Sequence, residues 1–179
     1  MTTFFSYDTK KRPQRTTLIK DTLTLLGGRK LKGKKRYKVY SHGLSLDLRQ
    51  SHGGQYKNNE WLYDLHWYTE AEEPYLPTSL PLVVECEWSH RKKGVRKIPY
   101  SGIKYDFQKL LVANADLRLM IFIIEKDKDI LELNKYFDKA IDSYIHLESN
   151  SKFLFIAFDE RLNGFHYAEK LKRERRTNR

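Results

Sequence analysis

Two acidic residues stand one residue apart within an apolar segment near the middle of the chain. The segment, residues 82–88 (LVVECEW), has the composition of a core strand. Side chains alternate between the two faces of a strand, so Glu85 and Glu87 point one way and their neighbours point the other. Burying two carboxylates on one face is costly unless a proton or a cation compensates them. Mg²⁺ is the usual cation, because it binds a few carboxylate oxygens together with water and substrate phosphate.

A third acidic residue, Asp64, lies in the preceding segment of strand type, residues 61–67 (WLYDLHW). A loop marked by three prolines joins the two segments, so we expect a hairpin or meander that brings Asp64 near the other two carboxylates. His66 shares the Asp64 face. It would either contact the same metal or phosphate, or pack among the aromatic residues beside it, and packing is the more common fate of a lone histidine.

A helix is expected to begin near residues 104–106, because apolar residues from Phe107 onward recur at helical spacing. Asp106 then stands where an N-cap residue would, so we expect it to cap this helix. Lys109 and Gln108 lie on the same helix. Lys109 would either join the carboxylates or form a solvated ion pair along the helix.

The remaining pattern predicts an α/β protein with a mixed β-sheet flanked by helices. Apolar residues at helical spacing predict a helix over 14–26 that ends at Gly27–Gly28, and a second amphipathic helix over 131–147. Near-continuous apolar runs predict strands covered on both faces at 117–124 (LRLMIFII) and 153–158 (FLFIAF). Residues 37–40 alternate like a short strand, and residues 165–176 fit either a closing helix or a strand.

The length of 179 residues fits one domain, and the ends at about 1–13 and 172–179 look loose and basic. Cys86 is the single cysteine, so no internal disulfide is expected. No apolar stretch is long enough to span a membrane, and the first residues lack the pattern of a secretory signal. These features favour the cytoplasm and give no reason to expect a membrane partner.

The formal charge of +11 and the pI near 9.6 favour a polyanionic partner, with nucleic acid first. The basic residues are clustered: residues 29–38 carry seven in ten, and residues 90–97 carry five. Such clusters fit either contacts to a phosphate backbone or solvated loops. The expected nucleic-acid contacts are Arg29, Lys30, Lys32, Lys34, Lys35, Arg91, Lys92 and Lys93.

The ordered set of motifs resembles the PD-(D/E)XK nucleases, whose architecture is called restriction-endonuclease-like. In that family a helix, a meander of strands, a crossover helix and a further strand form a three-layer core. An acidic residue on one strand is followed on the next by an acid-x-Lys motif. Asp64 matches the first acid, and Glu85-Cys86-Glu87 matches the second motif with Glu in place of Lys. Residues 106–111 and 117–124 look like the crossover helix and the strand behind it.

The resemblance implies a Mg²⁺- or Mn²⁺-dependent nuclease that hydrolyses phosphodiester bonds, in DNA rather than RNA. It assigns the metal to Asp64, Glu85 and the backbone carbonyl of Cys86. Glu87 would act as general base or bind a second metal, or Lys109 would supply the lysine function from its helix. Gln108 would orient a water or contact a phosphate. Enzymes that cut both strands commonly pair up, so a homodimer is compatible with this reading.

Two other readings stay open. In the first, a nuclease-fold protein without the usual lysine has lost catalysis and binds nucleic acid through its basic surface. In the second, a small basic protein uses the acidic patch to bind a partner protein. Cys86 as a nucleophile is disfavoured, because its side chain points away from the carboxylates and no histidine is paired with it.

Overall fold

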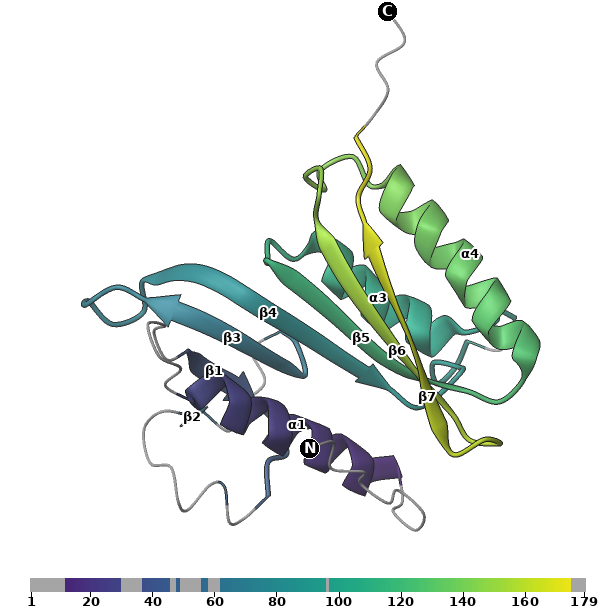
Figure 1. Ribbon diagram of the computed structural model, residues 1–179, viewed down its shortest axis with the longest axis horizontal. Helices are drawn as coiled ribbons and strands as arrows, with labels where there is room; N and C mark the ends of the chain where they lie inside the picture. Colours follow the sequence, from purple (N-terminus) through teal and green to yellow (C-terminus); the bar gives the residue numbers. More distant parts are fainter. Residues whose placement is uncertain are drawn as a thin grey trace, which may run out of the picture.

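The structure is a computed structural model that describes residues 12–29, 37–45, 48, 56–57, 62–95 and 97–174. These residues form an α/β fold in which three helices pack on a mixed β-sheet (Figure 1). The helices are α1 (Arg12–Gly28), α3 (Ser101–Val112) and α4 (Asp127–Ser143). The strands are β1 (Lys38–Ser41), β2 (Tyr56–Lys57), β3 (Leu65–Glu70), β4 (Pro77–Glu87), β5 (Leu117–Ile124), β6 (Lys152–Asp159) and β7 (Gly164–Leu171).

The sheet combines a meander with a parallel centre, in the order β2-β1-β3-β4-β5-β6-β7. Strands β1, β3 and β4 are antiparallel neighbours, which confirms the predicted hairpin. Strands β4, β5 and β6 are parallel, and β7 returns antiparallel to β6. Helices α3 and α4 make the two parallel crossovers. Because both crossovers advance in the same direction along the sheet, connections of one hand place both helices on one face.

Two apolar cores, one on each face of the sheet, give the molecule three layers. On one face, α3 and α4 bury a cluster of aromatic side chains that includes Phe107, Phe137 and Phe155. On the other face, Ile19 and Leu23 of α1 pack against side chains of the meander and of β5. Figure 1 shows α1 on the opposite side of the sheet from α3 and α4.

The two strands predicted from continuous apolar runs are confirmed. Strand β5 occupies residues 117–124, and seven of its eight residues are buried, because helices cover the central strands on both faces. Strand β6 extends the predicted run of 153–158 by one residue at each end.

The helix boundaries differ from the predicted ones where capping decides them. Helix α1 begins at Arg12, inside the predicted loose end, because Pro13 fits the first turn of a helix, where its missing N–H costs nothing. Helix α4 begins at Asp127 rather than 131. The Asp129 carboxylate accepts the backbone N–H groups of Glu125 and Lys126, each at 2.9 Å, and so satisfies the start of the helix.

The chain after β6 forms strand β7 and not a closing helix. Lys172, predicted to belong to the loose C-terminal end, is buried instead. Its ammonium donates hydrogen bonds to the carbonyls of Ile141, Asp142 and Tyr144, which α4 leaves without partners at its last turn. Among the helices that the structure describes, none combines the length and apolar character needed to cross a membrane.

Candidate active site

Asp64 lies in the bend just before β3. The sequence pattern had predicted that it would lie within the strand. The pairing of β3 with β4 starts at Leu65 and Val84, so β4 runs on beyond the start of β3. There the Asp64 carboxylate accepts the backbone N–H of Cys86 at 2.8 Å. The carboxylate thus continues the hydrogen bonding of the sheet edge, and this bond holds it next to the Glu85–Glu87 segment.

The other carboxylate oxygen of Asp64 accepts a hydrogen bond from Lys20 Nζ of α1 at 2.9 Å. Lys20 is only 5% exposed, and its ammonium also donates to the carbonyl of His42 at 3.1 Å. No pattern in the sequence pointed to this residue. Lys20, Thr24 and Gly27 recur at helical spacing and are all buried, but their small or polar character hides that face of the helix from a search for apolar periodicity.

Glu85 is the most buried acid of the group, with 1% of its surface exposed. One carboxylate oxygen, Oε2, accepts a hydrogen bond from Lys109 Nζ at 2.8 Å. The other, Oε1, is buried and has no hydrogen-bond partner among the described residues. Burial raises the pKa of Glu85 to about 8, although the ammonium of Lys109 acts in the opposite direction. A buried, unpartnered carboxylate oxygen is a place where a proton or a cation is expected.

Glu87 projects from the same face of β4 and is half-buried at the start of α3. One of its oxygens accepts the backbone N–H of Ser89 at 2.6 Å. Burial, together with the charge of Asp106 and a side-chain hydrogen bond to it, raises the pKa of Glu87 to about 7, because two carboxyl groups that share a hydrogen bond hold a proton between them. The predicted alternation of β4 is therefore confirmed, with Val84, Cys86 and Trp88 in the core on the α1 side.

Gly102 in the first turn of α3 permits the close approach of this helix to Glu87. A Cβ atom at position 102 would lie 2.5 Å from the carbonyl oxygen of Ser89 and 3.0 Å from Oε2 of Glu87. A real Cβ does not fit in that space. The early start of α3 at Ser101 also corrects the prediction for Asp106, which lies in the second turn of the helix and does not cap it.

Lys109 lies between two of the acids. Its ammonium is 2.8 Å from Glu85 Oε2 and 2.9 Å from Asp106 Oδ1, one helical turn earlier. Burial lowers the pKa of Lys109, but the two hydrogen bonds outweigh that effect and leave the pKa above its usual value. The structure thus brings Lys109 to the carboxylates. Gln108, at the neighbouring helix position, is exposed and lies outside this group.

Four carboxylates and two ammonium groups meet at this point, at the carboxyl end of β4. They are Asp64, Glu85, Glu87, Asp106, Lys20 and Lys109. When all six are ionised, two negative charges remain unbalanced, and a divalent cation would neutralise them.

The donor set fits a hard cation such as Mg²⁺. Within the described residues, no three His, Cys, Asp or Glu side chains form a ready-made metal cage. Mg²⁺ does not need one, because it usually binds one or two carboxylates and completes its octahedron with water and substrate phosphate. Asp64 and Glu85 would supply the two carboxylates, and the Cys86 backbone is next to both, because Cys86 follows Glu85 on β4 and its N–H is bonded to Asp64. The Cys86 thiol belongs to the opposite core, and burial raises its pKa, so it is unsuited to act as a nucleophile.

His66 packs among aromatic rings and does not reach the carboxylates. It is 1% exposed and stacks on Tyr40 with 5.0 Å between ring centroids, and Tyr63 and Tyr68 lie beside it. Burial lowers its pKa to about 4, so the ring is neutral at pH 7.

This burial predicts a loss of stability in mild acid. The pKa of His66 is about 4 in the folded state, against 6.5 as its ordinary value. The stability that the neutral, buried His66 ring contributes is therefore fully present above pH 6.5 and is lost as the pH falls toward 4. The loss in free energy of unfolding amounts to up to about 3 kcal/mol. Urea denaturation of the wild type and of His66→Gln at pH 7.0 and 4.5 measures it. The wild type should lose more stability than the variant between the two pH values; an equal loss would contradict a buried neutral imidazole.

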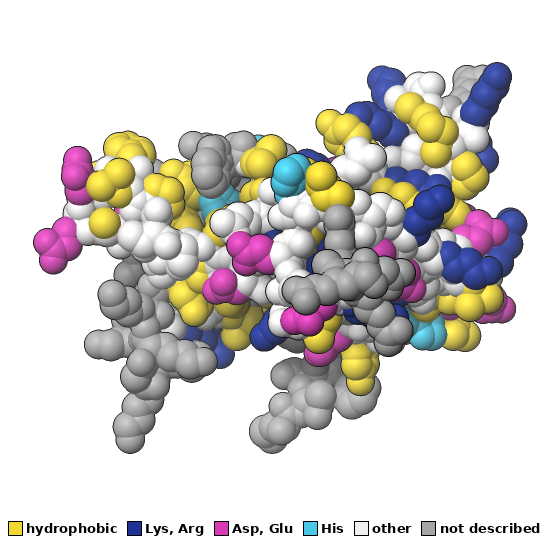
Figure 2. Space-filling view, turned by 90° about the horizontal axis from the view of Figure 1, so that it is seen from above, with side chains coloured by type: hydrophobic (Ala, Val, Ile, Leu, Met, Phe, Trp, Pro, Cys, Tyr) yellow, Lys and Arg dark blue, Asp and Glu magenta, His cyan; other side chains and the backbone are white. Residues whose placement is uncertain are grey.

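The basic residues after β4 lie close to the carboxylate group. Arg91, Lys92 and Lys93 are exposed on the loop between Glu87 and α3. Lys92 Nζ lies 3.1 Å from the centroid of the Tyr105 ring, and its backbone N–H donates to Ser101 Oγ, so the loop is fixed against α3. Arg29 is exposed at the end of α1, whereas Lys30, Lys32, Lys34 and Lys35 lie outside the described residues. In Figure 2, acidic side chains stand at the end formed by the β3–β4 hairpin, and Lys and Arg side chains gather at the opposite end.

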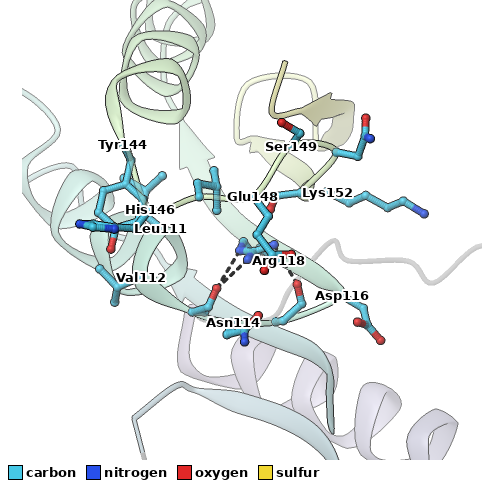
Figure 3. A pocket seen from close by; sticks show the side chains of 15 residues that line it. Leu111, Val112, Asn114, Asp116, Arg118, Tyr144, His146, Glu148, Ser149 and Lys152 are labelled. Carbon is cyan, nitrogen blue, oxygen red and sulfur yellow. Dashed lines mark hydrogen bonds between the residues drawn. The ribbon is translucent and has the colours of Figure 1, made fainter. Parts of the chain in front are cut away.

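A polar pocket of about 670 Å³ lies away from the carboxylates, at the amino-terminal ends of β5 and β6 (Figure 3). Arg118 is buried there, and its guanidinium donates to the carbonyls of Ala113 and Ala115 just after α3. It closes the end of this helix, which accounts for its burial. Ligands of open α/β sheets bind at the carboxyl ends of the strands, where Glu85 and Glu87 lie, so this pocket is not the candidate site.

Comparisons with known proteins identify no relative of the chain: no family model, no curated protein and no solved structure matches it.

Proposed function

We propose that this chain is a Mg²⁺- or Mn²⁺-dependent nuclease that hydrolyses phosphodiester bonds, with DNA as the favoured substrate. The observation that carries the proposal is the buried Glu85 at the carboxyl end of a core strand, which has one unpartnered oxygen and whose pKa is raised by burial and by the charge of Asp64. The order of helix, meander, crossover helix and strand supports the restriction-endonuclease-like reading of the fold.

In this proposal Asp64 and Glu85 hold the metal, with the backbone carbonyl of Cys86 as a third ligand. A bound Mg²⁺ would polarise the scissile phosphate and lower the pKa of a bound water. Glu87 would take a proton from the attacking water, because a carboxyl group with a pKa of about 7 exchanges protons efficiently at neutral pH.

Lys109 takes over the role of the lysine that the Glu-x-Glu motif lacks. The ammonium of Lys109, on α3, pairs with Glu85 on β4. A positive charge is therefore available where negative charge develops on the phosphate. The exposed basic residues at positions 91–93 adjoin the carboxylates and are suited to hold the phosphate backbone on either side of the scissile bond.

The first test is Asp64→Asn. The substitution keeps the size of the side chain and removes the charge that a metal needs, so divalent-dependent cleavage of plasmid or single-stranded DNA should fall by about 1,000-fold or more. The matched control is Asp138→Asn on the exposed side of α4, which should cleave like the wild type. Full activity of Asp64→Asn would remove Asp64 from the metal site.

A second test asks whether Lys109 supplies the lysine function. Lys109→Met should reduce kcat by about 100-fold or more with little change in KM, because it removes a charge that acts on the transition state. Lys139→Met, an exposed lysine of α4, serves as the control. Equal activity of Lys109→Met and the control would assign the lysine function elsewhere, with Lys20 as the next position to substitute.

One observation favours the alternative of a nuclease-fold protein that binds nucleic acid without cutting it. The ammonium groups of Lys20 and Lys109 already pair with Asp64 and Glu85, so half of the acidic group is neutralised from within the chain. Retained DNA binding that weakens steeply with salt, together with no cleavage in Mg²⁺ or Mn²⁺, would establish this alternative.

A further inference from the structure

Helix α1 covers only part of its face of the sheet and leaves an apolar groove beside it. The groove has a volume of about 540 Å³ and runs between α1 and the outer strands β6 and β7. Its lining is almost entirely apolar, with Ile19 and Leu23 on the helix, Leu154 and Ile156 on β6, and Phe165 on β7 among its members. Such a surface on a protein this strongly charged points to an interaction surface.

The groove opens onto the edge of the sheet, because β7 is the last strand in the described order. Phe165, Tyr167 and Leu171 alternate along β7 on the groove side and are 40%, 81% and 54% exposed. An edge strand also presents backbone N–H and C=O groups to a further strand. A lysine side chain that projects into solvent commonly prevents such an edge from pairing with another strand. Here the ammonium of Lys170 instead forms an ion pair with Asp138 of α4 at 2.5 Å. The exposed edge and the apolar groove therefore form one continuous surface.

The sequence of β7 is self-complementary in an antiparallel register centred on Ala168. If Ala168 lies on a two-fold axis, Phe165 opposes Leu171 of a second copy, and Tyr167 opposes Glu169. An axis at Tyr167 would instead place Phe165 opposite Glu169, and an axis at Glu169 would oppose two like charges. Pairing an aromatic with an aliphatic side chain and a phenol with a carboxylate is favourable, whereas the pairs made by these two axes are not. An axis at His166 would pair Phe165 with Tyr167, but it opposes two His166 side chains and leaves Glu169 and Leu171 without partners on β7.

We propose that two copies of this chain associate through β7, antiparallel about Ala168, and that each covers part of the other's groove. This contact is isologous, as expected for a two-fold dimer. The two Phe165 and two Tyr167 rings contribute on the order of several hundred Å² of buried surface. Together with Leu171, the strand backbone and the groove, the contact reaches the lower range of stable interfaces, roughly 1,000 Å². The dimer is independent of the nuclease proposal, because β7 lies three strands away from β4.

The experiment is sedimentation equilibrium on the full chain over a wide concentration range, with variants that exchange the two residues opposed across the axis. The wild type should show a monomer–dimer equilibrium. Tyr167→Glu places two carboxylates opposite each other and should raise the dissociation constant by about tenfold or more. The double variant Tyr167→Glu with Glu169→Tyr restores a Glu–Tyr pair in the same register and should recover the dimer.

Leu162→Glu, an exposed apolar residue in the turn before β7, is the matched control and should dimerise like the wild type. A wild type that is monomeric at every concentration would overturn the proposal and would assign the groove to another occupant, such as residues 1–11 with Phe4 and Phe5. A dimer that Tyr167→Glu leaves intact, or that the exchange fails to recover while the variant keeps the wild-type circular dichroism spectrum, would overturn the β7 register.

Discussion

Glu85→Gln is expected to abolish metal-dependent cleavage and, without metal, to make the folded protein more stable. Both effects have one cause, a buried carboxylate with one unpartnered oxygen. The charge is unfavourable in the empty site and is needed when a cation is bound. Gln keeps the shape of the side chain and an oxygen that can accept the Lys109 hydrogen bond, so the variant separates charge from packing.

The gain in stability should depend on pH in a defined direction. Burial raises the pKa of Glu85 from about 4.5 to about 8. The stability contributed by the protonated group is fully present below pH 4.5 and is lost as the pH rises toward 8. The variant keeps a neutral side chain throughout, so its advantage should grow over this range to about 2–4 kcal/mol at pH 8.

Urea denaturation in EDTA at pH 5 and pH 8 measures this advantage, and a cleavage assay in Mg²⁺ should show a loss of about 1,000-fold or more for Glu85→Gln. Glu73→Gln in the exposed β3–β4 loop is the control for both assays. Adding Mn²⁺ should stabilise the wild type and leave the Gln variant unchanged. A variant that is less stable than the wild type at pH 8 would show that Glu85 is a satisfied structural ion pair.

Gly102→Ala is expected to impair the site without replacing any charged group. The added Cβ would meet the backbone carbonyl of Ser89 at 2.5 Å, and a backbone atom cannot move aside as a flexible side chain can. Helix α3 must shift away from the end of β4, and it carries Lys109 and Asp106 with it. A displacement of about 1 Å in a catalytic group reduces the rate by about 100-fold.

The cost in stability should be smaller, about 1–2 kcal/mol, because Ala is favoured over Gly in a helix and offsets part of the overpacking. Cleavage kinetics and thermal denaturation of Gly102→Ala measure the two effects. Gly164→Ala is the matched control, because its new Cβ would find the nearest atom at 3.7 Å. If Gly102→Ala cleaved like this control, the packing of α3 on Glu87 would have no role in catalysis.

The sequence predicted those parts of the fold that local pattern determines. The apolar runs at 117–124 and 153–158 are β5 and β6, because strands covered on both faces carry few polar residues. The alternation in residues 82–88 correctly separated Glu85 and Glu87 from Cys86. The first residues of α3 and α4 were predicted several positions too late. Where a helix begins depends on contacts that form only in the folded chain, such as the hydrogen bonds that Asp129 accepts from the N–H groups before α4.

The sequence predicted the acidic residues Asp64, Glu85 and Glu87 of the candidate site. It did not assign two of their partners, Lys20 and Asp106, to the site. Lys20 is distant in sequence, and only the packing of α1 brings its ammonium to Asp64. Asp106 was assigned to a helix cap because the start of α3 was predicted several residues too late. Contacts between elements that are far apart in the sequence leave no periodic signal, so neither partner could be read from the chain alone.

The most direct test of the central claim is a crystal structure grown with Mn²⁺ and measured at the manganese absorption edge. We expect one anomalous peak between the Asp64 and Glu85 carboxylates, with Glu85 Oε1 as a ligand, and no such peak in crystals of Glu85→Gln. A wild-type structure in millimolar Mn²⁺ that shows no peak there, with Lys109 still bonded to Glu85, would contradict a metal-dependent nuclease.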